Sequence, residues 1–443
     1  MTPFHRSTGN QNISIIGMGY VGLPTALAFH DAGYNVTGVD VSKQVIEILS
    51  RGEVHLVDDH SDLKIPVDSD RWKVTCSFSE SVRYSDIVII TVPTPVNSDK
   101  NPDLSYVRSA FESVLRNIDV NRKSIVVLES TVFPGVTNSI AKEIASKRNL
   151  RVGEDFDLAY SPERVSPGEI GKGASDVTRI VGSEIPEVGI LLTEVYSGIT
   201  TGGCSYVGKM EVAEAAKMIE NTQRDIDIAF VNELSTILPK MGLDVMEVLD
   251  AASTKWNFHR HTPGIGVGGH CIPVDPYYYI QCSKEVGSIS TLSPSARHIN
   301  ESMPEYSAKQ ISEILGGTGS ILILGLAYKP NVGDIRETPV LQMINALANE
   351  GIASKVWDPF IRVAIDLPEK CKLIDDPYVA ADGADMVVLA TGHDACINLD
   401  WGLIKEKLAK PVLFDGPRVL NREKLELMGW KYTGVGNPNE ENN

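Results

Sequence analysis

The sequence of 443 residues has no long hydrophobic run, few cysteines, and fewer basic than acidic side chains. No apolar run approaches the roughly 18 residues of a membrane-spanning helix, and the polar residues 1–12 lack the apolar core of a signal peptide. No two of the six cysteines stand two or three apart, which argues against a CxxC redox pair or a zinc ribbon. The formal net charge of −17 argues against an electrostatic nucleic-acid binder. We expect a reduced, cytoplasmic protein that binds neither membrane nor nucleic acid.

The first half of the chain has the pattern of a doubly wound α/β domain. A short apolar run at 12–17 leads into a helical stretch at 23–32 and a second apolar run at 35–40. Strand, helix and strand in this order indicate a βαβ unit and hence a parallel sheet. Further strands are predicted at 87–92, 125–128, 156–160 and 179–181. We predict a Rossmann-like domain over 10–204.

The rest of the chain predicts a helical middle and a second α/β domain. Apolar residues recur at three- and four-residue spacing over 209–238, which indicates a long helix. Residues 257–276 are too rich in Gly, Pro and His for regular structure. Further helices are predicted at 245–252, 294–315 and 339–351, and strands at 320–325, 355–358, 386–391 and 411–416. We predict a central helical domain over 205–315, a second Rossmann-like domain over 316–434, and a frayed tail after residue 434.

A glycine-rich turn follows the first predicted strand. Gly17, Gly19 and Gly22 form a GxGxxG string that opens a helix, and Asp40 ends the next strand. In this context the glycines allow a tight turn, close approach to a pyrophosphate and close packing of helix on strand. An acidic side chain at position 40 would bind ribose hydroxyls and repel a 2′-phosphate. The pattern predicts an NAD site in preference to an NADP site.

One cysteine stands in a different setting from the other five, which we interpret as small core residues. Cys271 ends a glycine-rich loop, and Asp275 follows four residues later. A metal site that combines Cys271 with His259, His261 and His270 is the competing interpretation, but the spacing matches no common zinc arrangement. A purely structural cysteine is the third. We predict no metal and a nucleophilic thiol.

A nucleophilic cysteine beside NAD suits the oxidation of an aldehyde, or of an alcohol through an aldehyde. Such chemistry needs groups that stabilise an oxyanion. Lys217 and Asn221 stand four residues apart on the long predicted helix, so both project from one face, and Arg224 lies three residues further on. The alternative is a solvated surface trio.

Seven strings in order give the chain a resemblance to the UDP-glucose/GDP-mannose dehydrogenase family. They are IIGMGYVGLP, VPTP, ESTVFPG, SPERV, EAAKMIENTQRD, PGIGVGGHCIPVDPYY and GLAYKPNVGDIRETP. Members of that family oxidise the C6 alcohol of a nucleotide sugar to a carboxylate with two NAD. The resemblance implies that the third domain binds UDP and that the central helix forms a dimer interface, so we expect a homodimer or a higher homo-oligomer.

The resemblance also implies roles for residues at the matching positions. Cys271 would be the nucleophile, Lys217 and Asn221 would stabilise the oxyanion, and Asp275 would support water and proton transfer. Glu163 would take part in thioester hydrolysis. The implied cofactor-binding residues are Gly17, Gly19, Tyr20, Val21, Gly22, Asp40, Thr94, Thr131 and Arg336. The implied substrate-binding residues are Arg164, Val165, Lys217, Asn221, Arg224, His259, Arg260, Gly268, Tyr328, Lys329 and Arg418.

Residues 263–275, which we call the cysteine loop, indicate which sugar the protein acts on. His270 and Val274 depart from the GGSC or GGYC and PKD strings of the UDP-glucose branch. The loop is more similar to enzymes that act on UDP-N-acetylhexosamines, and we favour UDP-N-acetyl-D-mannosamine over UDP-N-acetylglucosamine, with UDP-glucose and GDP-mannose behind them. A non-catalytic nucleotide-sugar or NAD sensor and a one-step 2-hydroxy-acid dehydrogenase are the alternatives from other classes.

Overall fold

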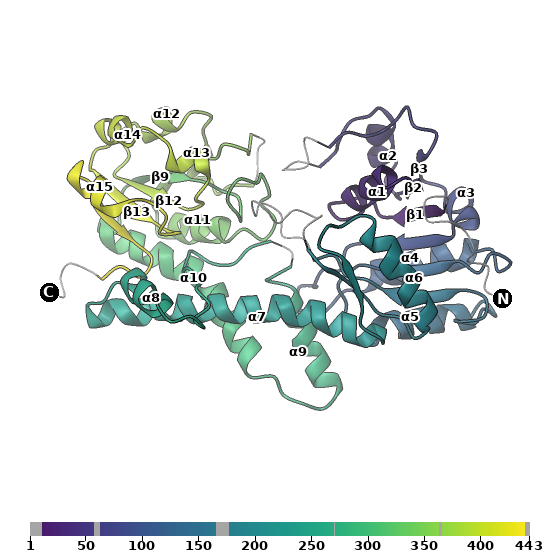
Figure 1. Ribbon diagram of the computed structural model, residues 1–443. Coiled ribbons are helices and arrows are strands. Elements are labelled where there is room, and N and C mark those ends of the chain that lie inside the picture. The colour runs from purple at the N-terminus through teal and green to yellow at the C-terminus, as the bar shows by residue number, and fades with distance from the viewer. Residues whose placement is uncertain (1–10, 57–62, 165–176, 270, 363–365, 439–443) are drawn as a thin grey trace. The chain divides into compact units, whose positions relative to one another are not determined.

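The computed structural model describes residues 11–56, 63–164, 177–269, 271–362 and 366–438 (Figure 1). The chain divides into two compact units. The first comprises Met1–Glu220 and Tyr277–Ser288, and the second comprises Asn221–Pro276 and Ile289–Asn443. Helix α7 (Met210–Ile237) runs without interruption from the first unit into the second. The predicted division into three domains therefore stays a prediction beside these two units.

The first unit is built on a six-stranded sheet in the order β3-β2-β1-β4-β5-β6, in which all neighbours pair in parallel. This is the order of the Rossmann fold, which reverses between β1 and β4. The strands are β1 (Asn12–Ile16), β2 (Asn35–Val39), β3 (Trp72–Thr75), β4 (Ile87–Ile90), β5 (Ile125–Leu128) and β6 (Asp157–Tyr160). The helices are α1 (Gly22–Asp31), α2 (Lys43–Ser50), α3 (Phe78–Ser81), α4 (Ser105–Asn117), α5 (Val136–Ser146) and α6 (Pro186–Ser197). All residues of β4 and β5 are buried, since helices cover both faces of the sheet.

The second unit repeats this topology with the strand order β11-β10-β9-β12-β13-β14, again with all neighbours parallel. The strands are β9 (Ser320–Leu324), β10 (Ala353–Trp357), β11 (Cys371–Leu373), β12 (Met386–Leu389), β13 (Val412–Asp415) and β14 (Lys431–Gly434). The helices are α8 (Val245–Ser253), α10 (Leu292–Leu315), α11 (Pro339–Asn349), α12 (Pro377–Ala381), α13 (Asp394–Ile397), α14 (Trp401–Lys407) and α15 (Arg422–Leu427). Helix α9 (Asp275–Glu285) begins in this unit and continues into the first. The predicted fold of two doubly wound domains joined by a long helix is confirmed.

The structure differs from the sequence-based prediction at the sheet edges and in the tail. The edge strands β3, β11 and β14 were not predicted, because three or four residues of mixed polarity give no clear period. Strand β7 (Arg179–Val181) pairs with β8 (Cys204–Tyr206) in a separate two-stranded sheet. The expectation of a frayed tail is wrong for its first residues: Val435 is fully buried, and the carbonyl of Gly436 accepts a hydrogen bond of 3.0 Å from the Val245 N–H.

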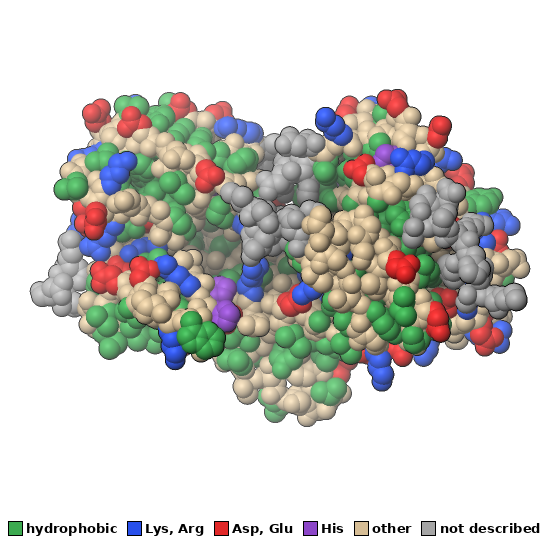
Figure 2. Space-filling model, in the orientation of Figure 1, with side chains coloured by type: hydrophobic (Ala, Val, Ile, Leu, Met, Phe, Trp, Pro, Cys, Tyr) green, Lys and Arg blue, Asp and Glu red, His purple; other side chains and the backbone are tan. Residues whose placement is uncertain are grey.

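The described helices include none that combines the length and the apolar character needed to cross a membrane. In Figure 2, blue Lys and Arg side chains and red Asp and Glu side chains are interspersed over the visible face of the described residues. Neither unit presents a continuous basic field on the face that this view shows.

Gly436 generates a prediction for the stability of the second unit. Its φ is +76°, and a Cβ there would lie 2.2 Å from Val245 Cγ1. We expect Gly436→Ala to lower the free energy of unfolding by about 1–3 kcal/mol through overpacking, as measured by urea denaturation. Gly316→Ala is the matched control, because its φ is +75° and its Cβ would meet nothing within 4 Å. Equal losses in both variants would mean that backbone strain, and not the contact with α8, sets the cost.

Candidate functional site

In the turn after β1, Gly17, Gly19 and Gly22 each have a different structural environment. Gly17 has a φ of +96°, which only glycine adopts without strain. At Gly22 a Cβ would lie 1.8 Å from the carbonyl oxygen of Gly17, so this position needs glycine for α1 to start against the turn. At Gly19 a Cβ would meet nothing within 4 Å. No atom of the described residues therefore packs against the backbone of Gly19 on the side where a Cβ would stand. Such an open backbone is expected where a ligand approaches.

Asp40 lies at the end of β2, beside this turn. Its Oδ2 accepts a hydrogen bond of 2.9 Å from the Met18 N–H, and its Oδ1 accepts one of 2.8 Å from the Ser42 N–H. Each carboxylate oxygen has a second lone pair, so both can still accept from ribose hydroxyls. Thr94 and Thr131 follow β4 and β5, at the same carboxyl edge of the sheet. The residues present fit a dinucleotide with a free 2′-hydroxyl, with its pyrophosphate at the N-terminus of α1.

The cysteine loop forms a hydrogen-bonded turn in the second unit. The carbonyl of Cys271 accepts from the N–H groups of Val274 at 3.1 Å and Asp275 at 2.8 Å, and its side chain is exposed. Asp275 is 2% exposed, and its Oδ2 accepts a hydrogen bond of 2.5 Å from the Asn221 side-chain amide. The turn thus couples the position of the thiol to a buried carboxylate and, through it, to helix α7.

Lys217 lies one turn before Asn221 on α7 and is 9% exposed. A buried ammonium is costly unless it has a partner or a function. The alternative of a solvated surface trio is therefore wrong for Lys217, although it describes Arg224, whose side chain is exposed.

The glycines of the cysteine loop permit close packing on residues 325–339. A Cβ at Gly268 would lie 2.5 Å from Tyr328 Cβ, and one at Gly269 would lie 2.7 Å from the Tyr328 ring. The N–H of Gly269 donates to the carbonyl of Arg336 at 3.1 Å. Two predicted substrate ligands, Gly268 and Tyr328, are thereby brought together in the second unit.

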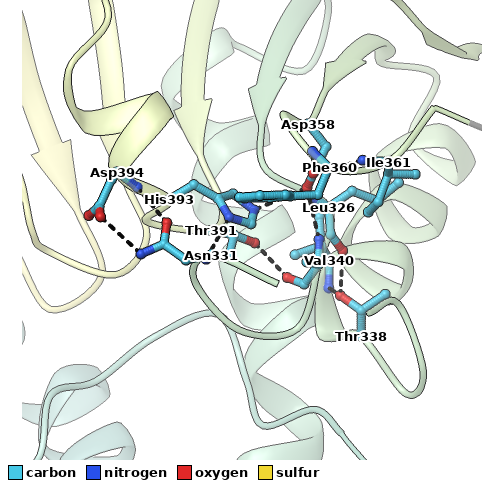
Figure 3. Close-up of polar contacts among 11 residues, drawn as sticks. Leu326, Asn331, Thr338, Val340, Asp358, Phe360, Ile361, Thr391, His393 and Asp394 are labelled. Carbon is cyan, nitrogen blue, oxygen red and sulfur yellow. Dashed lines mark hydrogen bonds and ion pairs between the residues drawn. The ribbon is translucent and has the colours of Figure 1, made fainter. Parts of the chain in front are cut away.

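A buried pair, Asp358 and His393, anchors the segment 325–339 (Figure 3). Asp358 Oδ2 accepts from the N–H of Leu326 at 2.7 Å and lies 3.1 Å from His393 Nε2. The Asn331 N–H donates to His393 Nδ1 at 2.9 Å, which places the imidazole proton on Nε2. Burial would raise the pKa of Asp358, but hydrogen bonds from His393 and backbone N–H groups outweigh it and lower that pKa.

Asp358 occupies the same place in the second sheet as Asp40 in the first. Asp40 follows β2, the neighbour of β1, and Asp358 follows β10, the neighbour of β9. Its oxygens, however, are filled by protein donors, including the N–H groups of Phe360 at 2.8 Å and Ile361 at 3.2 Å. Gly325 has a φ of +87°, and a Cβ there would lie 2.5 Å from Thr391 Cβ. In the second Rossmann-like unit, the carboxylate at the position equivalent to Asp40 thus binds the protein's own backbone and His393.

Comparison with known families decides the identity of the chain. Models of the UDP-glucose/GDP-mannose dehydrogenase family match its NAD binding domain to residues 11–200, its central domain to 211–302 and its UDP binding domain to 322–422. The chain belongs to the UDP-glucose/GDP-mannose dehydrogenase family. It is accordingly a nucleotide-sugar 6-dehydrogenase, an oxidoreductase that uses NAD.

Individual members of the family align along nearly all of the chain. A UDP-N-acetyl-D-mannosamine dehydrogenase of Pyrococcus horikoshii is 34% identical and covers 96% of this chain and 99% of its own. A UDP-N-acetyl-D-glucosamine 6-dehydrogenase of Salmonella typhi is 36% identical over 86% and 89% of the two chains. The solved structure of a UDP-glucose dehydrogenase from Pyrobaculum islandicum has a TM-score of 0.85 at 28% identity and covers 98% and 99% of the two chains. The fold is thus shared by family members named for different sugars.

Several basic side chains predicted to bind substrate or cofactor form ion pairs with acidic side chains. These pairs are Arg164 with Glu220, Arg260 with Asp250, Arg336 with Asp334 and Arg418 with Asp244. Arg418 is the most enclosed of the four, with 5% of its side chain exposed. Their ligand-binding roles, like those of the half-buried Lys329 and the exposed His259, stay predictions. Val165 lies outside the described residues.

The other cysteines differ from the expected set of core residues at one position. Cys371 and Cys396 are buried, Cys204 and Cys282 are half-buried, and burial raises the pKa of all four thiols. Cys76 is exposed, so the core interpretation is wrong for it. Across the described residues, no three His, Cys, Asp or Glu side chains are grouped as metal ligands; His270 lies outside those residues.

The sequence analysis did not identify two residues that hydrogen-bond to segments following β4 and β5, at the carboxyl edge of the first sheet. Tyr278, which is fully buried, donates its hydroxyl to the carbonyl of Thr94 at 3.0 Å. Glu214 accepts from the N–H groups of Gly135 at 2.6 Å and Thr137 at 3.0 Å, at the start of α5. Both lie inside strings that carry the family resemblance, but only the fold shows what they contact.

The open space at Gly19 predicts a separation of stability from cofactor affinity. We expect Gly19→Ala to unfold at the wild-type urea midpoint and to bind NAD about tenfold more weakly, because a methyl group would occupy the bare approach to the pyrophosphate. Calorimetric titration with NAD measures the affinity. Gly22→Ala, whose Cβ would overlap the Gly17 carbonyl, should lose both stability and binding. Unchanged NAD affinity in Gly19→Ala would contradict the assignment of the site.

Proposed function

We propose that the chain oxidises the C6 alcohol of a UDP-N-acetylhexosamine to the carboxylate through a thioester on Cys271, with UDP-N-acetyl-D-mannosamine as the favoured substrate. The observation that carries the proposal is the exposed thiol in a turn fixed by the buried Asp275, which itself binds Asn221. A thiol that only filled space would be buried, as those of Cys371 and Cys396 are. UDP-N-acetylglucosamine is the alternative substrate.

The proposed chemistry removes four electrons in two oxidations. NAD, when bound, accepts a hydride in each. Between them the Cys271 thiolate forms a bond to the C6 aldehyde carbon, and Lys217 and Asn221 stabilise the negative charge that develops on the aldehyde oxygen. The second oxidation leaves C6 as a thioester. Water activated by Glu163 then attacks C6, and the Cys271 thiolate leaves. One alcohol, two NAD and one water give one carboxylate, two NADH and three protons.

The preference for an N-acetylhexosamine is supported by the cysteine loop and by relatives. Val274 stands where the UDP-glucose branch has the lysine of its PKD string. Val274 is 7% exposed, so an apolar side chain replaces a charged one in the turn that carries the thiol. Relatives at 34% and 36% identity are named for UDP-N-acetyl-D-mannosamine and UDP-N-acetyl-D-glucosamine.

We also propose that the chain forms a dimer through an apolar face of α7. Val212, Ile219 and Phe230 are 50%, 50% and 52% exposed, and Ile237 is 46% exposed. Spacings of seven or eleven residues bring these four side chains to one face of a single helix. Four large apolar side chains exposed on one helix face are typical of an interface with a second copy.

The substrate assignment predicts the yield of NADH with limiting sugar. We expect two NADH for each UDP-N-acetyl-D-mannosamine, followed by absorbance at 340 nm, and little turnover of UDP-glucose or GDP-mannose. Turnover of UDP-N-acetylglucosamine alone would move the assignment to the other epimer. One NADH per sugar would indicate a one-step dehydrogenase, and binding without turnover would indicate a sensor.

The covalent mechanism predicts the behaviour of a cysteine variant. We expect Cys271→Ser to lose at least about 10³-fold in kcat for acid formation, because it cannot capture the aldehyde as a thioester. Cys76→Ser, which changes another exposed thiol, is the control and should keep wild-type activity. Wild-type acid formation by Cys271→Ser would overturn the mechanism.

The dimer proposal predicts the effect of a charge on α7. We expect wild-type protein to run as a dimer in light scattering and Phe230→Glu to shift it toward the monomer, because a carboxylate would have to be desolvated in the interface. Leu427→Glu, which alters a 90% exposed apolar residue on α15, should leave the mass unchanged. A monomeric wild type would contradict the proposal.

A further inference from the structure

A cluster of charged and polar side chains, most of them buried, includes Glu163 in the first unit. It consists of Glu129 after β5, Glu163 after β6, Arg179 in β7 and Tyr196 in α6, and we call it the Arg179 cluster. Strands β5 and β6 are parallel neighbours, so their carboxyl ends bring the two glutamates to the same edge of the sheet.

Arg179 is held between the two carboxylates. One guanidinium nitrogen donates to Glu129 Oε1 at 3.3 Å, and another donates to Glu163 Oε2. The Tyr196 hydroxyl donates to Glu129 Oε1 at 2.6 Å, and its ring centre lies 5.2 Å from the guanidinium carbon. The orientation of Arg179 is therefore fixed on both sides by partners from other elements.

The burial of this cluster is uneven. The side chains of Arg179 and Glu129 are 4% and 0% exposed, and that of Glu163 is 16% exposed. Glu163 is thus the member that reaches solvent. Its Oε1 accepts the N–H of Arg164 at 2.7 Å, so both oxygens of its carboxylate are oriented by the protein.

The cluster is expensive to bury for stability alone. Two carboxylates share one guanidinium, and Oε2 of Glu129 has no hydrogen-bond partner among the described residues. Burial raises the pKa of Glu129 to about 7, against the opposing effect of Arg179. A protein with well-packed apolar side chains of similar volume at these positions would often be at least as stable. Stability therefore does not account for the cluster, and a functional role does.

We propose that Arg179, held in place by Glu129 and Tyr196, is the positioning residue that orients Glu163 for hydrolysis of the Cys271 thioester. This inference rests on the proposed function, because it assigns Glu163 the water-activating role given there. When Glu129 is ionised, Arg179 divides its ion pairing between two carboxylates. When Glu129 is neutral, Glu163 is the one ionised partner of Arg179 in the cluster, and its carboxylate is less available to activate water.

Charged and polar groups from several elements act on this balance, including Ser161, which hydrogen-bonds Tyr196. Arg179, Glu163 and Tyr196 act on Glu129, and the Cys204 thiol of β8 acts on Arg179. We expect the wild-type rate of acid release to fall as the pH drops through about 7, where Glu129 takes up a proton.

The test separates the oxidations from hydrolysis in a single turnover. Full-length protein is mixed with NAD and UDP-N-acetyl-D-mannosamine, or with the sugar of the panel that reacts, and is quenched with acid at intervals. NADH reports the two oxidations, mass spectrometry reports the adduct on Cys271, and chromatography reports the released acid.

At pH 8 we expect Glu129→Gln to form both NADH at the wild-type rate, to release acid at least about tenfold more slowly and to accumulate the adduct, because Arg179 then pairs with the Glu163 carboxylate alone and makes it less available to activate water. Its acid release should also lose the pH step near 7. Arg179→Lys should show the same accumulation, since a single ammonium does not reproduce the fork between two carboxylates. Tyr196→Phe, which removes one hydroxyl, should slow the same step less.

Arg122→Lys is the matched control, because it alters an ion pair with Asp86 at 2.9 Å elsewhere in the same unit and should leave all three readouts unchanged. Equal slowing of every step in the cluster variants, or unchanged acid release, would overturn the inference. If Arg179→Lys does not fold, Glu129→Gln and Tyr196→Phe decide the question. Failure of the proposed function has a different signature: the wild type yields one NADH per sugar, or Glu163→Gln accumulates no adduct on Cys271.

Discussion

Parallel pairing of β1 with β2 and β4, and of β4 with β5, places four carboxyl strand ends at one edge of the first sheet. Four of the residues predicted to bind the dinucleotide in this unit depend on that alignment. Gly19, Asp40, Thr94 and Thr131 are far apart in sequence, yet each follows one of these strand ends. Backbone hydrogen bonding, which is independent of side chains, thus sets where the polar side chains can act.

The two Rossmann-like units show how hydrogen-bond capacity divides their roles. Asp40 receives two backbone N–H groups and retains lone pairs for a ligand, whereas Asp358 receives several backbone donors as well as His393. The first carboxylate is available to a dinucleotide, and the second fixes the segment 325–339 on which the cysteine loop packs. The same topology therefore gives a turn with free acceptor capacity, predicted to bind the dinucleotide, in one unit and a hydrogen-bonded support for the cysteine loop in the other.

The sequence by itself determined the features that depend on local pattern. The alternation of apolar runs with helical periods predicted both doubly wound domains and α7, and the strand–glycine–helix–Asp40 order predicted the dinucleotide turn, because these signals lie within a few dozen residues. Cys271 stood out through its glycine-rich neighbours. The edge strand β3 and the buried tail at Val435 escaped prediction, since neither has a period of its own.

Only the tertiary structure decided the environments of individual charges. Lys217 is buried, while Arg224 on the same helix is exposed. The carboxylate of Asp40 keeps lone pairs for a ligand, whereas the carboxylate of Asp358 is occupied by donors of the protein. Glu129, Arg179 and Tyr196 carry no local signal, because their meeting depends on strand order and on the packing of α6. Periodicity predicts which face of a helix or strand is buried. The partner of a buried charge depends on which elements the fold packs together.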